Sequence, residues 1–365
     1  MDFGQEEWAN ATKHTYEISV LKPGDIILST SPGKESQVIK KFTKSPYSHA
    51  MLYADKTIVH ADINGVFTTN PQRRLFPDGT SLVLRLRNGN AATGFAACQF
   101  ALNLAGSSYS IPAAVKSYSL RKTVLQSESS TQFCSRLVAQ AYAHAGVPLV
   151  KNPDFCFPGD FANTDLLEVV SGATRQAVPA ELDLAATPDT VRIHQDHTYA
   201  WLRPLCDLIE DAGFARPDNI ADALQSIIAH PQFDADACQL LIASEYLTDY
   251  NLDRIPNPHR YDLRAFESIL LARPREAAHI LATEYDIAAD IMRQALSQYP
   301  QYDKVQLRSF RLLADMHRNR LIQSEGRIHD IHVLATRFNH TPLALKSASS
   351  LAGVRTFLTA NQPRQ

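Results

Sequence analysis

The sequence predicts an α+β protein in which an antiparallel sheet packed on helices is followed by an all-α region. In the first part of the chain, short apolar runs of strand length alternate with turn residues. From Thr198 onward, apolar residues recur three and four positions apart, the spacing of helices. Between these parts, glycines and prolines interrupt the periodicity. We therefore predict a first domain over residues 1–175, a linker over 176–195 and a helical domain over 196–365.

Local patterns predict the individual elements of the first domain. Lys22-Pro-Gly-Asp25 is a turn signal before a buried strand, and Asp55-Lys56 predicts the turn of a hairpin. Helices are expected over residues 36–43, from about 92 to 105, and within 161–170. One strand is predicted at the end of the run 21–28, after its turn. Further strands are predicted over 47–53, 57–61, 65–69 and 81–86.

The composition excludes several classes of protein. The 365 residues are 45% hydrophobic and 20% charged, with a net charge of -2, so an ordinary globular protein is expected and nucleic acid is not an expected partner. The five cysteines are an odd number without a C-x-x-C pair, which argues against a disulfide framework or a zinc site. No metal or other cofactor is predicted.

The N-terminal sequence and the hydropathy indicate where the protein is made. Met1 to Trp8 is acidic and has no apolar core, so no Sec-type signal peptide is predicted. The sequence has no run of about 18 apolar residues, so no transmembrane segment is predicted. We expect a protein that is cytoplasmic as synthesised. Delivery by a dedicated, non-Sec secretion system would leave the same signature and is kept as an alternative.

One predicted helix carries a candidate nucleophile. Leu137, Val138 and Ala141 lie at helical spacing, and Thr131 is a plausible N-cap for this helix. On this interpretation Cys134 lies in the first turn, where amide N–H groups without intrahelical partners favour a thiolate. The alternative is a free cysteine that is simply a small, buried core residue.

Two histidines on neighbouring predicted strands could serve such a nucleophile. His49 begins one strand, a rigid and partly open place for a general base. The hairpin brings His60 close to it, so that one imidazole could orient the other. Asp62, two residues on, has the same side-of-sheet parity and is the fallback orienting group. The alternative is that both histidines are ordinary, half-buried strand residues.

These motifs, in this order, resemble the circularly permuted NlpC/P60 superfamily of papain-like proteins. The nearest branch is the YiiX/YebB-like cysteine hydrolases, and the lecithin:retinol acyltransferase-like proteins are more distant. The resemblance covers roughly residues 17–170, and the histidine strand precedes the cysteine helix, opposite to papain order. The motifs are Leu21 to Leu28, Phe42 to Tyr53, Ile58 to Ala61, Gly65-Val66, Gly106-x-x-Tyr109 and Phe133 to Val138.

The resemblance implies a fold and a set of roles. It implies a permuted papain-like domain, with Cys134 as nucleophile, His49 as base and His60 as third polar group. Acyl transfer would run through a thioester, with the oxyanion met by amides at the helix N-terminus. Tyr47, two residues before His49, is a candidate extra oxyanion donor, although a core or rim tyrosine is the alternative. Ser135 is a candidate support of the first helical turn.

Three functions stay open at this point. The first is a thiol hydrolase of amide bonds, of the peptidoglycan-peptide or isopeptide type, for which a role as a secreted effector is kept open. The second is a lipid or ester acyl hydrolase or acyltransferase, because many YiiX-like relatives have glutamate where this chain has His60. The third is an inactive binding module. The helical part is a candidate surface for a protein partner, with no individual residue to assign.

Overall fold

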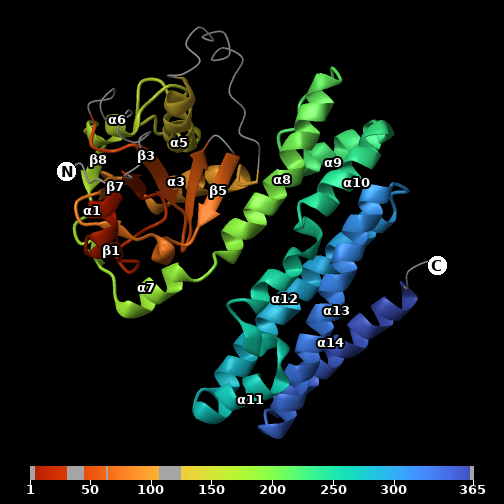
Figure 1. The fold of residues 1–365 in the computed structure, drawn as a ribbon. Coiled ribbons are helices and arrows are strands. Elements are labelled where there is room, and N and C mark those ends of the chain that lie inside the picture. The colour runs from red at the N-terminus through yellow and green to blue at the C-terminus, as the bar shows by residue number, and fades with distance from the viewer. Residues whose placement is uncertain (1–4, 31–44, 63–64, 107–124, 362–365) are drawn as a thin grey trace. The chain divides into compact units, whose positions relative to one another are not determined.

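The computed structural model describes residues 5–30, 45–62, 65–106 and 125–361 (Figure 1). Contacts divide the chain into two compact units: Met1–Cys206 with Glu210–Ala223, and Asp207–Ile209 with Leu224–Gln365. The first contains the sheets and the second is helical, so the α+β class is confirmed. The helix expected over 36–43 and the motif residue Tyr109 lie outside the described residues.

A six-stranded antiparallel sheet forms the centre of the first unit, in the order β5-β4-β3-β2-β7-β8. Asp55 and Lys56 adopt φ values of 46° and 62° in the turn between β3 and β4, the left-handed conformation that suits a tight hairpin. The short helix expected within 161–170 is misplaced: α6 (Pro158–Ala162) starts earlier and ends at Ala162, and the stretch after it contains β8, which pairs with β7. The strands are β2 (Ile26–Ser29), β3 (His49–Tyr53), β4 (Ile58–Asp62), β5 (Gly65–Thr69), β7 (Ser81–Leu86) and β8 (Leu167–Val169).

Two helices cover one face of this sheet. They are α3 (Ala91–Asn103) and α5 (Leu125–His144), and their buried residues share a core with alternate residues of the strands. Gly24 and Gly94 let α3 approach the turn before β2, because a Cβ on Gly24 would lie 2.6 Å from the Gly94 Cα. Any side chain at these two positions would push α3 off the sheet.

A second, three-stranded sheet packs on the other face. Its order is β6-β1-β9, formed by β1 (Lys13–Tyr16), β6 (Phe76–Pro77) and β9 (Thr174–Gln176). Tyr16 and Phe76 from this sheet join Ile27, Met51 and Ile58 of the main sheet in one buried cluster. The helix α1 (Gln5–Asn10) precedes β1. The main sheet is therefore buried on both faces, and side-chain parity decides which cluster a strand residue enters.

The stretch expected to be a linker, residues 176–195, is largely helical. Here lie α7 (Pro179–Ala186) and the start of α8 (Thr190–Asp211). Pro179 occupies the first turn of α7, where proline has no amide to lose and favours helix initiation, so it begins a helix where a break was expected. Gln195 makes hydrogen bonds to the amide, carbonyl and hydroxyl of Thr68, which attaches α8 to the β5 edge.

The second unit is built on three long consecutive helices. The contacts join α12 to α13 and α13 to α14, and Leu281, Ile328 and Leu351 lie in their common core. Among the described residues, no helix is long and apolar enough to cross a membrane. The remaining helices of the described residues are α9 (Ile220–Ala229), α10 (Asp234–Ala243), α11 (Leu263–Ala272), α12 (Ala277–Asp303), α13 (Arg308–Arg337) and α14 (Thr341–Ala360), with 3-10 helices η1 (Pro71–Arg73), η2 (Pro231–Phe233), η3 (Tyr246–Arg254) and η4 (Pro258–Tyr261).

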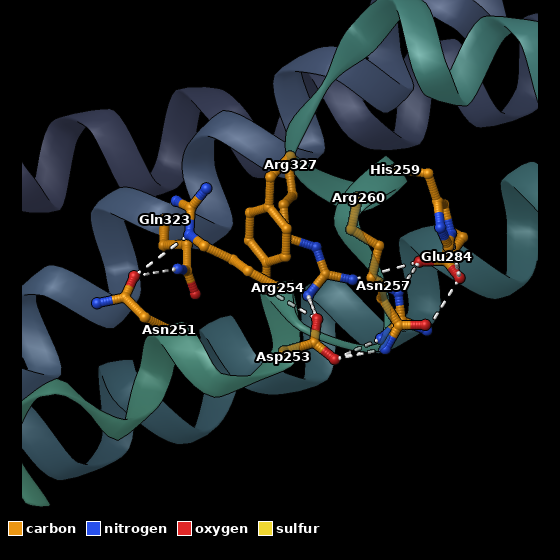
Figure 2. Close-up of polar contacts among 10 residues, drawn as sticks. Asn251, Asp253, Arg254, Asn257, His259, Arg260, Glu284, Gln323 and Arg327 are labelled. Atoms are coloured by element: carbon orange, nitrogen blue, oxygen red, sulfur yellow. Dashed lines mark hydrogen bonds and ion pairs between the residues drawn. The ribbon is translucent and has the colours of Figure 1, made fainter. Parts of the chain in front are cut away.

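A cluster of two carboxylates and two guanidiniums ties η3 and η4 to the long helices (Figure 2). Arg260 binds Asp253 at 2.8 Å and Glu284 at 2.7 Å. Arg327, only 4% exposed, lies 3.3 Å from Glu284 and 3.7 Å from Asp253. Tyr261 and Asn257 donate to the Asp253 carboxylate as well. Every charge here faces an opposite one, which a buried ionic cluster requires.

This cluster predicts a specific loss of stability. Replacing Arg327 by methionine removes a buried charge that faces Glu284 and leaves that carboxylate with less compensation. We expect the free energy of unfolding of the helical unit to fall by about 3 kcal/mol in urea titrations. The control is Arg293→Met, which breaks an exposed pair with Asp290 and is expected to cost below about 1 kcal/mol. Equal losses for the two variants would contradict the prediction.

Candidate active site

Cys134 lies in the interior of α5. The helix begins at Leu125, so Thr131 is inside it and is not its N-cap. The first-turn position expected for Cys134 is therefore wrong. The apolar pattern begins only near residue 133, whereas serine and glutamate continue the helix before it without an apolar signal. Amides in a helix interior donate to carbonyls four residues earlier, so they are not spare oxyanion donors.

The Cys134 thiol instead meets the backbone of strand β3. Its sulfur is fully buried and accepts a hydrogen bond from the Ala50 amide at 3.4 Å. The ladder between β3 and β4 is formed at Leu52–Val59 and Tyr53–Ile58, toward the turn. At Ala50 the two strands have separated. The Ala50 amide, which would bind β4 if the ladder continued, points at the thiol instead. Cys134 thus occupies the place where the hairpin opens.

Burial keeps this thiol protonated. Desolvation raises the pKa of Cys134 to about 11, and the Ala50 hydrogen bond offsets only part of that effect. Ser135, also fully buried, holds its hydroxyl 3.9 Å from the sulfur and acts in the same direction as Ala50. The resting sulfur is therefore a thiol rather than the thiolate expected at a helix N-terminus.

The hairpin brings the two histidines together. His49 is the first residue of β3 and His60 lies in β4. The Nε2 atom of His49 lies 3.3 Å from the Nδ1 atom of His60, and the rings meet edge to face. One imidazole donates and the other accepts, according to the tautomers. Because Nε2 is held in this contact, Nδ1 of His49 is the nitrogen left to exchange a proton with another group.

The thiol and the imidazoles approach β3 from its two faces. Ala50 belongs to the core cluster that contains Cys134, whereas Met51 belongs to the cluster on the opposite face. Side chains alternate along a strand, so His49 projects on the Met51 face. Nδ1 is the ring nitrogen closer to the backbone, and the next residue along is Ala50, whose amide binds the sulfur. The two groups therefore flank the same short piece of backbone at the opening of the hairpin.

Both imidazoles are neutral at physiological pH. Burial, followed by the charge of Arg74, lowers the pKa of His49 to about 3. Burial also holds the pKa of His60 well below its usual value, and the His49, Arg74 and Arg192 charges act in the same direction. A neutral imidazole can accept a proton, so His49 is suited to the role of a base that works during the reaction.

An aromatic ring and two arginines surround the histidine pair. Phe67 in β5 stacks on His60 with ring centroids 6.0 Å apart, and the guanidinium of Arg192 lies 4.2 Å from the Phe67 centroid. Arg74 donates to the Met51 thioether at 2.7 Å. The sequence reasoning missed both arginines. Arg192 fell in the expected linker, and only the strand register could have pointed to Arg74.

The other residues named from the sequence are placed as follows. Tyr47 is half-buried and packs against the cluster of Cys134, and burial raises the pKa of its phenol, which keeps it a hydrogen-bond donor. Asp62 ends β4 opposite Gly65, and its side chain is outside the described part of the structure. No group of three potential metal ligands occurs among the described residues.

A cavity of about 580 Å³ lies elsewhere in the first unit. It is lined by the Gly24 turn, the start of α3 and Tyr142. Gly24 donates to the carbonyl of Tyr53, the last residue of β3, whereas His49 is the first. About 13 Å of strand separates these ends, so the cavity is not part of the Cys134 site.

The strand bearing the histidine precedes the helix bearing the cysteine, which is the order expected of a permuted papain-like domain. In a comparison with protein families, residues 20–165 match Peptidase_C92, described as a permuted papain-like amidase enzyme of the YaeF/YiiX type. The match confirms the resemblance seen in the sequence, and it covers less than half of the chain. A search of curated proteins finds no match. The first part of the chain is thus similar to a family of enzymes.

The pKa values predict how the thiol reacts with pH. A thiol with a pKa near 11 gains thiolate about tenfold per pH unit over the neutral range. We expect the rate of Cys134 alkylation by iodoacetamide to rise at about that slope from pH 6 to pH 9, followed by mass spectrometry of the Cys134 peptide. A plateau starting near pH 4 would indicate a preformed thiolate–imidazolium pair and contradict the prediction.

Proposed function

We propose that the first unit is a cysteine amidase. Cys134 is the nucleophile, His49 is the general base, and His60 orients the His49 ring. The observation that carries the proposal is the hydrogen bond from Ala50 to the Cys134 sulfur, because it fixes the thiol beside the residue that follows His49. The family match supports amide chemistry, and the His49–His60 contact supports a paired base.

The reaction begins from neutral groups. As the Cys134 sulfur attacks the amide carbon, the thiol proton passes through the opening of the hairpin to Nδ1 of His49, and a tetrahedral intermediate forms. The Ala50 N–H points at the sulfur and can donate to the oxyanion that forms on the carbon bonded to that sulfur, with the Tyr47 hydroxyl as a second donor. The C–N bond then breaks, and His49 returns the proton to the leaving amine. Water activated by His49 hydrolyses the thioester.

The substrate class follows from the family and not from any bound ligand. Amides of the peptidoglycan-peptide or isopeptide type are the proposed substrates, and delivery of the protein as a secreted effector stays a prediction from the sequence. His60, in a position where many YiiX-like relatives have glutamate, favours a second candidate, an acyl hydrolase or acyltransferase acting on lipid esters. The two candidates share the thioester and differ in the leaving group.

The test compares single and double variants in one assay set. Purified muropeptides and phospholipid vesicles are each incubated with the wild type, Cys134→Ala, His49→Ala and the double variant, and released amines and acyl chains are quantified. We expect Cys134→Ala to lower amide cleavage about a thousandfold or more. Because nucleophile and base act as a unit, the double variant should be no slower than Cys134→Ala alone.

The matched control is Cys238→Ala, which removes a nearly buried thiol in the helical unit and should leave cleavage unchanged. Cleavage that survives Cys134→Ala would refute the cysteine amidase. Acyl release without amide cleavage, lost in Cys134→Ala, would favour the ester candidate instead.

A further inference from the structure

We propose that Arg74 forms a carboxylate-binding subsite beside the His49–His60 pair. The preferred amide substrate then carries a free carboxylate near the scissile bond. This inference rests on the proposed function and deepens it by naming a property of the substrate. It assigns to Arg74 a role in recognition rather than in proton transfer.

The position of Arg74 follows from strand β3. Arg74 comes directly after η1, and its guanidinium is held over β3 by the hydrogen bond to the Met51 sulfur. Met51 lies two residues after His49 and on the same face, so their Cβ atoms are about 7 Å apart. The guanidinium therefore lies along the strand face that presents the His49 ring. The positive charge of Arg74 lowers the pKa of both imidazoles, which is in accord with this placement.

The bonding of Arg74 is incomplete. A guanidinium has five N–H donors, and a thioether is a weak acceptor. Among the described residues, the Met51 sulfur is the hydrogen-bond acceptor of Arg74, and no carboxylate pairs with it. Arg85 in the same unit instead binds both oxygens of Asp25 at 2.7 Å, and Arg175 binds Glu17 and Glu181. A half-buried cation without an anion is costly, so its natural complement is an anion from outside the chain.

The second arginine near the pair is already occupied. Arg192 forms an ion pair with Asp196 at 2.9 Å and stacks over Phe67. Asp196, on the same helix, compensates its charge, and the contact with Phe67 makes Arg192 part of the lining of the site. Arg74 is thus the cation here that is available to a ligand.

A carboxylate is the anion that an amide substrate can offer at this position. The planar guanidinium matches the two oxygens of a carboxylate with paired hydrogen bonds. Peptide amides near a free carboxylate, such as those next to a chain end or an acidic side chain, present such a group.

Two reagents of nearly equal size test the subsite directly. Iodoacetate and iodoacetamide both alkylate a thiol: the sulfur–carbon bond forms, the carbon–iodine bond breaks and iodide leaves. Only iodoacetate carries a carboxylate. The rate at Cys134 is measured for each reagent at pH 8.5 by mass spectrometry and divided by its rate with free glutathione. We expect the iodoacetate-to-iodoacetamide ratio to fall about tenfold in Arg74→Gln.

Two further variants separate recognition from general effects. Arg74→Lys keeps the charge and should keep much of the ratio. Arg73→Gln loses the same charge from an adjacent residue that hydrogen-bonds Thr187, and should keep the wild-type ratio. The iodoacetamide rate reports in each variant whether the site is still folded.

The outcomes distinguish this inference from the proposed function. A ratio that is unchanged in Arg74→Gln, whether or not both rates fall together, would overturn the subsite and leave the amidase intact. An equal fall of the ratio in Arg73→Gln would reduce the effect to net charge and also overturn it. Failure of both reagents to label Cys134 in the wild type would refute the nucleophile itself, and the subsite with it.

Discussion

The hydrogen bond between the Ala50 amide and the Cys134 sulfur is the contact on which the site depends. It exists because β3 and β4 pair only near their turn and separate toward Ala50. A continued ladder would consume that amide, and the helix could bring its thiol only onto a closed sheet. The open end of the hairpin therefore lets one helix and two strands contribute to a single place. The sheet, α5 and the packing on both faces serve to keep that opening fixed.

The protonation states in the site follow from the burial of its titratable groups. Burial raises the pKa of Cys134 and lowers that of His49, so both groups rest without charge. A charged pair in the same place would need enough compensation to offset its desolvation. Ala50 and Ser135 supply part of this for the sulfur, and His60 supplies a fixed orientation for His49. In the proposed mechanism, charge is therefore separated only when the substrate binds.

Much of the first unit could be predicted because its elements are local. The strand patterns, the Asp55-Lys56 turn and the pairing of His49 with His60 all follow from period-two alternation and hairpin register. The start of α5 could not be predicted, because a polar first half of a helix leaves no apolar period. The helices within 176–195 could not be predicted for two other reasons. The hydrogen bonds of Gln195 to Thr68 are tertiary contacts, and Pro179 can either start a helix or break one.

A thiol held in its protonated form has one more consequence. Peroxides oxidise thiolates to sulfenic acids and react slowly with thiols. Cys134, buried and with a pKa near 11, is therefore slow to react with peroxides. Burial makes the resting thiol a weak nucleophile, and it also protects the sulfur from irreversible oxidation. The packing of α5 against the sheet therefore makes this cysteine resistant to oxidative stress.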